Sequence, residues 1–109
     1  MNKMKDKFKS KYPLWRWDIP KEFNIGSACS DRQLNLNNGN NIAMVVEDDV
    51  FGSSQITYQQ LSKKTNQFSE LIKRLNLIPH SRVLIRIPNC LNYPISFLGA
   101  IKSGHIAVP

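Results

Sequence analysis

The stretch VLIRIPNCLNYPISFLGAIKSGHIAV, residues 83–108, decides the fold of this chain. Its apolar run at 83–87 predicts a strand, and a helix is expected from about Asn92 to Ser103. Pro94 fits that helix only in the first turn, where its missing N–H leaves no hydrogen bond unmade, so the N-cap is expected near Asn92 or Tyr93. A second short strand is expected at 105–108. Strand, helix and strand predict a βαβ unit with parallel strands and a right-handed crossover.

The clearest helix of the chain lies upstream of this unit. Thr57 and Gln60 have the spacing of a capping box, with Thr as the N-cap. Apolar side chains then recur at helical spacing and form one stripe: Leu61, Thr65, Phe68, Leu71, Ile72 and Leu75. Charged residues face outward, and Glu70 precedes Arg74 by four residues, which favours a weak ion pair. Asn76 can adopt the left-handed conformation that ends a helix.

A shorter helix is expected earlier, at residues 23–36. Asn24 and Ser27 are both candidates for its N-cap. The Asn-rich run at 35–41 is dense in turn-forming residues and predicts a loop.

A β-hairpin is expected between that loop and the long helix. The runs 42–46 and 55–58 are suited to two antiparallel strands joined by a long loop. Three acidic residues at 47–49 fall in the loop, where we expect them to be solvated because no matching cation ligand follows them.

The net charge of +7 is concentrated at the N-terminus. Residues 1–21 contain seven Lys and Arg residues against two Asp residues, so the remaining 88 residues carry only +2. We interpret 1–21 as a basic, flexible leader. Trp15 and Trp17 lie in its last part, between two prolines, and are expected to anchor an extended segment on the chain's own domain. In the alternative, the leader and its tryptophans hold nucleic acid.

The sequence contains no apolar run that approaches the ~18–20 residues needed to cross a bilayer. The basic leader is not followed by an apolar segment, so a secretory signal is not predicted and the cytoplasm is the default location.

Side chains suited to catalysis or metal binding do not form a recognisable motif. In open α/β sheets ligands bind beyond the carboxyl ends of the strands, which here means the turn at 88–92. That turn contains no glycine, so a phosphate-binding loop is not predicted. Cys29 and Cys90 are expected to be reduced thiols, and His80 and His105 lack neighbouring ligands. The sequence predicts no catalytic, cofactor-binding or metal-binding residue.

The last predicted strand leaves an apolar sheet edge, which natural proteins normally pair, cover or charge. We therefore expect part of the domain to be missing. The stability of the chain is expected to be poor, because the edge at Ile106 and the stripe of the long helix lack their usual cover.

An ordered series of short motifs spans residues 17–109. The first are WDIP (17–20), FNIG (23–26), CSDR (29–32), ITYQQLS (56–62) and NQFS (66–69). The later ones are SRV (81–83), PNC (88–90), FLGAIKSG (97–104) and AVP (107–109). Together they resemble the N-terminal part of the acyl-CoA and acetyl-CoA synthetases, which belong to the AMP-binding, adenylate-forming ligases. In these enzymes Gly-Asp usually stands where this chain has His80-Ser81, and the second helix seldom contains a proline such as Pro94.

The resemblance implies an α/β fold, of which residues 22–109 are an incomplete N-terminal part. It also implies that the parent enzyme uses ATP and Mg²⁺ to activate a carboxylic acid as an acyl-adenylate and then transfers the acyl group to coenzyme A. The family's phosphate loop, Mg²⁺-binding acid, ribose-binding Asp and catalytic Lys all lie downstream of the matched part. The chain alone is therefore expected to be inactive, and its expected partner is the rest of the enzyme, on the same or a separate chain.

Two other functions compete with this interpretation. One is the nucleic-acid-binding protein that would use the Lys/Trp leader. The other is an interaction module that docks the stripe of the long helix on a partner, and it requires Leu61, Phe68 and Ile72 to be exposed.

Overall fold

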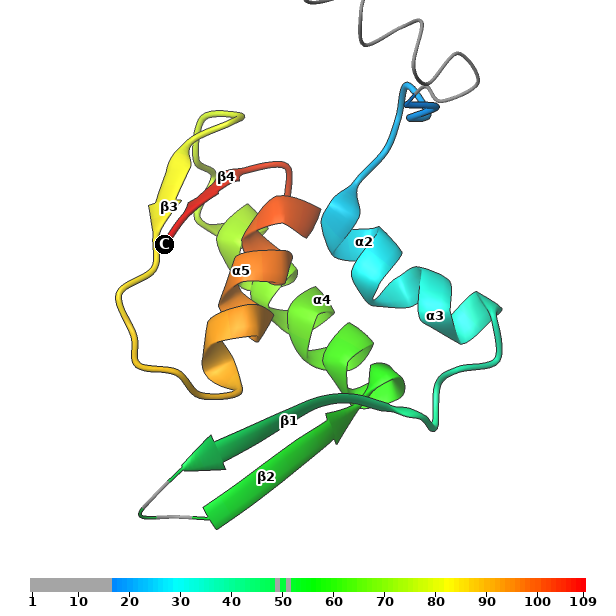
Figure 1. Cartoon of the computed structure of the whole chain (residues 1–109). Helices are drawn as coiled ribbons and strands as arrows, with labels where there is room; N and C mark the ends of the chain where they lie inside the picture. The colour runs from blue at the N-terminus through cyan, green and yellow to red at the C-terminus, as the bar shows by residue number, and fades with distance from the viewer. Residues whose placement is uncertain (1–16, 49, 51) are drawn as a thin grey trace, which may run out of the picture.

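Two packed helices, α4 and α5, form the centre of the structure (Figure 1). The computed structural model describes residues 17–48, 50 and 52–109, so most of the predicted leader lies outside the described residues. The elements in chain order are α2 (Ile25–Cys29), α3 (Asp31–Asn35), β1 (Ile42–Asp48), β2 (Gly52–Thr57), α4 (Tyr58–Arg74), β3 (Arg82–Leu84), α5 (Asn92–Lys102) and β4 (Ile106–Val108). This order confirms the predicted α/β class with a hairpin, a helix and a βαβ unit.

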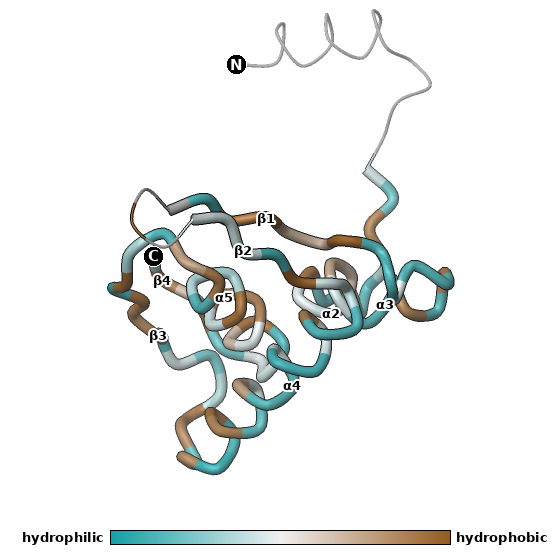
Figure 2. The backbone as a smooth tube through the Cα atoms, turned by 90° about the horizontal axis from the view of Figure 1, so that it is seen from below, coloured by the Kyte–Doolittle hydropathy of each residue, from teal (hydrophilic) through white to brown (hydrophobic). Residues whose placement is uncertain are grey.

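The remaining elements surround the helix pair on three sides (Figure 1). Helices α2 and α3 lie beside α4 and α5 on one side, and the parallel strands β3 and β4 lie on the other. The β1–β2 hairpin crosses one end of the helices. Figure 2 shows hydrophobic residues along both β1 and β3.

Helix α4 begins at the predicted capping box. The Thr57 hydroxyl accepts a bond from the Gln60 backbone N–H at 3.3 Å, and the Gln60 side chain accepts one from the Thr57 N–H at 2.9 Å. Asn76 has a φ of 50° just after the helix, as predicted for its stop.

The buried face of α4 differs from the predicted stripe. Leu61, Thr65 and Ile72 are buried, but Leu71 and Leu75 are more than half exposed. The small side chains of Ser62 and Ser69 are buried instead. Helices α3 and α5 both contact α4, and small residues permit their close approach, which a count of apolar residues alone does not reveal.

Helix α5 meets α4 at a glycine. A Cβ atom on Gly99 would lie 2.9 Å from two side-chain atoms of Phe68 and 3.0 Å from the Thr65 carbonyl oxygen. The N-cap of α5 is Leu91, just before the predicted Asn92 or Tyr93, and Pro94 lies in the first turn as predicted.

Strands β3 and β4 pair in parallel, with Val83 opposite Ala107. The ladder closes with a bond of 2.8 Å from the Ile85 N–H to the Val108 carbonyl. The first strand was predicted to extend over 83–87 and is shorter, because β4 offers only three residues for pairing.

The hairpin strands pair antiparallel, with a bulge between Ile42 and Met44. The prediction of a long loop is wrong: Glu47 pairs with Ser53 and the ladder extends to Gly52. Polar residues thus continue the strands well beyond their apolar parts.

The helix predicted at 23–36 is two short helices that meet at Ser30. The Ser30 hydroxyl donates to the Gly26 carbonyl at 2.7 Å, and Ser30 is fully buried. Asn24 is the cap of α2, since its side chain accepts from the Ser27 N–H. The core below these elements is formed by Ile56, Leu61, Ile95 and Leu98.

Candidate functional site

A buried polar cluster joins three helices of the fold. The Lys102 ammonium, at the end of α5, lies 2.8 Å from the Asp31 carboxylate of α3. It also donates to the hydroxyls of Ser30 and Thr65, each at 3.2 Å. The Ser62 hydroxyl donates to Asp31 at 2.5 Å. We call these five residues the Lys102 cluster.

The Lys102 side chain is only 5% exposed, whereas that of Asp31 is 37% exposed. The lysine stem passes closely over α2, because a Cβ on Gly26 would lie 2.7 Å from its Cγ and 2.6 Å from the Leu98 carbonyl oxygen. Gly26 is therefore needed where α2 crosses α5.

The electrostatics of the cluster favour an ionised Asp31. Burial raises the pKa of this carboxyl, but the hydrogen bonds from Lys102 and Ser62 and the charge of Lys102 outweigh burial and hold the pKa below its usual value. A hydrogen bond from the Asn66 side chain also lowers the pKa of Asp31.

The cluster is suited to cross-linking helices and not to catalysis. An ammonium group has three N–H donors, and Asp31, Ser30 and Thr65 accept all three. The sequence analysis missed this cluster. Its only signal is that Lys102 is a lone charge on an otherwise uncharged helix, and its partner Asp31 lies 71 residues away.

The turn predicted to lie at a ligand edge, 88–92, follows β3 in an exposed loop. Cys90 in this turn is half-buried, and Cys29 is exposed at the end of α2; the two thiols are free, as predicted. His80 lies in a turn with a φ of 63°. His105 is fixed by Ser103, whose hydroxyl lies 3.0 Å from its Nδ1.

Among the described residues, no three His, Cys, Asp or Glu side chains lie close enough together to hold a metal ion. Glu47 of the acidic run is exposed on β1. Trp17 is largely exposed, while Trp15 and the Lys-rich segment lie outside the described residues. We expect no nucleic-acid partner, and the alternative in which the leader binds nucleic acid is not tested by the described residues.

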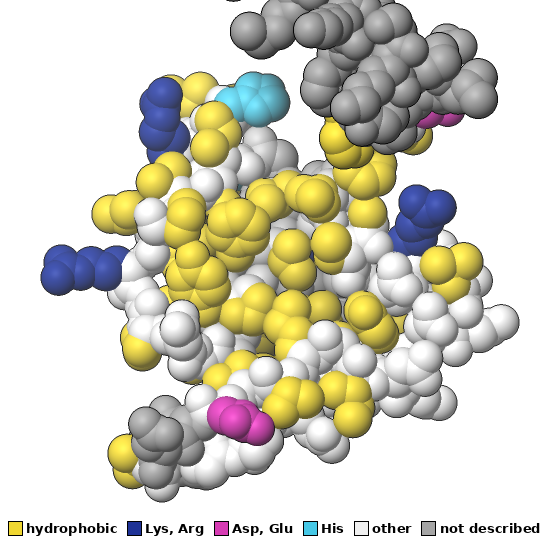
Figure 3. Space-filling model, viewed as in Figure 1, with side chains coloured by type: hydrophobic (Ala, Val, Ile, Leu, Met, Phe, Trp, Pro, Cys, Tyr) yellow, Lys and Arg dark blue, Asp and Glu magenta, His cyan; other side chains and the backbone are white. Residues whose placement is uncertain are grey.

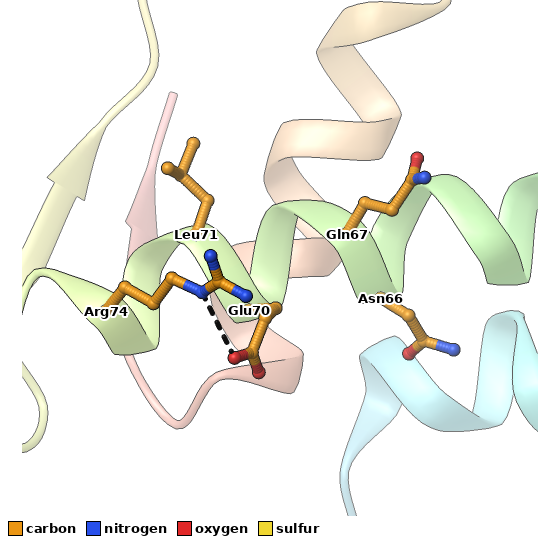
Figure 4. A pocket seen from close by; sticks show the side chains of 5 residues that line it. All are labelled: Asn66, Gln67, Glu70, Leu71 and Arg74. Carbon is orange, nitrogen blue, oxygen red and sulfur yellow. Dashed lines mark hydrogen bonds and ion pairs between the residues drawn. The ribbon is translucent and has the colours of Figure 1, made fainter.

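Figure 4 shows a surface depression along the outer side of α4. Its lining residues all come from this one helix: Asn66, Gln67, Glu70, Leu71 and Arg74. The predicted ion pair of Glu70 and Arg74 is present at 3.4 Å. Because no second element among the described residues supplies a facing group, these five side chains alone do not enclose a ligand.

The condition for the interaction-module alternative is not met. Leu61 is 1% exposed and Ile72 is 6% exposed, and both lie on the inner face of α4. In the described part of the chain, no helix is both long enough and apolar enough to cross a membrane.

Comparison with known proteins identifies the class. The model of the AMP-binding enzyme family matches residues 31–109, and the chain therefore belongs to this family. This confirms the resemblance inferred from the motifs.

Acetyl-coenzyme A synthetases and a benzoate CoA ligase are among the proteins that the chain resembles. The acetyl-coenzyme A synthetase of Herminiimonas arsenicoxydans is 30% identical over 72% of this chain and 12% of its own length. That of Cupriavidus necator is 31% identical over 87% of this chain and 14% of its own length. The structure of a benzoate CoA ligase from Burkholderia xenovorans LB400 matches 78% of this chain and 16% of that enzyme, with a TM-score of 0.60 and 25% identity.

The chain thus spans about a sixth or less of the length of these relatives. Among the described residues, the turn after β3 has no glycine that would let the backbone approach the phosphates of a nucleotide, and metal-binding side chains for Mg²⁺ do not gather.

Proposed function

We propose that residues 22–109 are a scaffold part of an ATP-dependent acid–CoA ligase. The observation that carries this proposal is the family match over 31–109, which includes α4 and the whole βαβ unit. The likeness to the benzoate CoA ligase over 78% of the chain supports the same assignment. The parent reaction is activation of a carboxylic acid as an acyl-adenylate, followed by acyl transfer to coenzyme A.

The chain's own residues contribute structure to that enzyme. The Lys102 cluster fixes α2 and α3 against the α4–α5 pair, and its three ammonium donors are all accepted within the protein. The βαβ unit supplies the beginning of a parallel sheet. Neither feature provides a nucleophile, a general base or a phosphate site, so residues 1–109 alone are catalytically inactive.

The proposal places the active site in residues that the chain does not contain. The relatives are six to eight times as long as the part they share with it, which leaves room for all the catalytic motifs of the family. We propose residues 1–21 as a basic leader that precedes this part in the sequence.

Acid-dependent exchange of labelled pyrophosphate into ATP tests the proposal. Residues 1–109 and the product of the complete reading frame are assayed side by side with acetate, benzoate and longer acids. We expect no exchange from residues 1–109 and acid-dependent exchange from the longer product. Exchange by residues 1–109 alone would show that catalytic residues have been overlooked, and a longer product without any exchange would remove the proposed parent activity.

A further inference from the structure

Apolar side chains are exposed at the end of α4 and in the loop that joins it to β3. Leu71 and Leu75 lie four residues apart, on one side of the helix, and are more than half exposed. In the loop, Leu77 is 41% exposed and Ile78 is 81% exposed, the highest value among the large hydrophobic residues of the described chain. Single exposed apolar residues are ordinary, but a group of them marks an interaction surface. We call these four residues the 71–78 patch.

The loop holds Ile78 in a fixed position. The Ile78 carbonyl accepts a bond of 3.1 Å from the Ser81 N–H and one of 2.6 Å from the Ser81 hydroxyl, and these bonds close the turn 78–81. Pro79 restricts the backbone inside this turn. In Figure 2 the chain between α4 and β3 projects beyond the helices, with hydrophobic residues along it. An exposed side chain that is already held in place loses little conformational entropy when it binds.

The chain is basic around the patch. Residues 71–109 contain five Lys and Arg residues and no Asp or Glu. Lys102 and Arg74 have acidic partners in the structure. Lys73 and Arg82 are exposed on either side of the loop, and neither pairs with an acid among the described residues. Figure 3 shows hydrophobic side chains beside a Lys or Arg side chain on the upper left, where the loop enters β3.

Aliphatic side chains flanked by unpaired cations complement an anionic lipid surface. The apolar side chains can enter the boundary between headgroups and acyl chains, while the cations lie at the lipid phosphates. A single-stranded nucleic acid would favour aromatic side chains on which bases stack, and the patch contains none. The combination of charge and aliphatic exposure therefore favours a membrane surface.

We infer that the 71–78 patch, together with Lys73 and Arg82, is a docking surface for an anionic phospholipid bilayer. Ile78 and Leu75 enter the interface, and the two cations contact lipid phosphates. The attachment is peripheral, because only the end of α4 and its loop take part. This inference goes beyond the proposed function and does not depend on it.

Flotation of residues 1–109 with lipid vesicles in a sucrose gradient tests the surface. Vesicles of phosphatidylcholine with about 30% phosphatidylglycerol are the anionic probe, and vesicles of pure phosphatidylcholine are the neutral one, both at about 0.15 M salt. The bound fraction over a series of lipid concentrations gives the dissociation constant of each variant. Circular dichroism confirms that each variant is folded.

One pair of variants tests the apolar contact. Ile78→Ser removes the most exposed side chain of the patch. Ile42→Ser is its control, because Ile42 is 53% exposed and pairs with Thr57 at the opposite end of α4.

A second pair tests the charge. The double variant Lys73→Gln and Arg82→Gln removes the two unpaired cations, and the double variant Lys63→Gln and Lys64→Gln removes the same charge from an exposed part of α4. Lys63 precedes Lys73 by ten residues, which is about 15 Å along a helix and exceeds the Debye length of about 8 Å.

We expect Ile78→Ser to weaken binding to anionic vesicles by about fivefold or more and the Lys73 and Arg82 double variant by about tenfold or more, with both controls within about twofold. Neutral vesicles should bind the wild type at least about tenfold more weakly.

Three results would overturn the inference. The first is a chain that does not bind anionic vesicles. The second is equal binding by the patch variants and their controls, which would assign the binding to the leader or to net charge. The third is a dimer in sedimentation velocity without lipid that Ile78→Ser converts to a monomer, which would make a second copy the occupant. The exchange assay of the proposed function is independent of all three.

Discussion

Helices α4 and α5 lie side by side but are built for different surroundings. Helix α4 has one buried face and an outer face rich in Lys, Glu and Arg, which is the pattern of a helix at a protein surface. Helix α5 has no charged residue before Lys102, and among the described residues its Tyr93, Phe97 and Ile101 side chains are only half-buried. The contrast teaches that the outer face of α4 has the composition of a solvent-facing surface, whereas α5 has the composition of a helix that is covered on every side.

The largest loss of stability is expected from a substitution on the buried side of α4. Leu61→Ala removes a side chain that is fully buried in the core, and we expect a loss of about 2–5 kcal/mol in the free energy of unfolding. Leu71→Ala on the exposed side is expected to cost less than about 1 kcal/mol. Urea denaturation in a stabilising osmolyte measures both, and similar losses from the two variants would contradict the assignment of the faces.

A smaller loss in the free energy of unfolding is expected from a substitution at Lys102, the charged end of α5. Lys102→Met leaves the Asp31 carboxylate without its cation, and we expect a loss of about 2 kcal/mol, below the cost at a fully buried pair because Asp31 is partly exposed. Adding Asp31→Asn should restore part of the lost stability. Lys73→Met, on the exposed side of α4, is the control. If the two lysine variants are equally stable in the same denaturation assay, the cluster does not join the helices.

The next smaller loss of stability is expected at the contact between α4 and α5. Gly99→Ala places a Cβ against Phe68 and the Thr65 carbonyl, and overpacking outweighs the gain in helix propensity, for a net loss of about 1 kcal/mol. Ser96→Ala on the same helix should not destabilise the chain. A stabilised Gly99→Ala variant would show that the two helices separate readily.

The smallest expected effect is the pH dependence of the stability that Asp31 contributes. The pKa of Asp31 is lowered in the folded state, so its contribution to stability is present above its unfolded value of 3.8 and is lost as the pH falls through the folded value. Between about pH 6 and about pH 3 the unfolding midpoint in urea should fall further for the wild type than for Asp31→Asn. Equal falls would contradict a lowered pKa.

The sequence predicts the features that local patterns determine. The capping box at Thr57, the parallel pairing around Val83 and the position of Pro94 in the first turn are all confirmed. The capping box and Pro94 depend on residues within one element, and the parallel pair depends on the single crossover through α5 that joins its two strands.

The features that the sequence does not predict depend on distant contacts. The break at Ser30 and the burial of Ser62 and Ser69 follow from the packing of α3 and α5 on α4. The pairing of Lys102 with Asp31 joins residues 71 positions apart. The lone charge of Lys102 on α5 is a local signal, but it does not identify the distant partner, so the Lys102 cluster went unpredicted.

Scanning calorimetry of residues 1–109, at a concentration at which they are monomeric, tests the central claim most directly. If α5 is an interior helix left half covered, the chain should unfold in a broad transition of small enthalpy. A sharp, cooperative transition with the roughly 60–80 kcal/mol expected of a complete domain of this size would show that the described fold is self-sufficient and would contradict the claim.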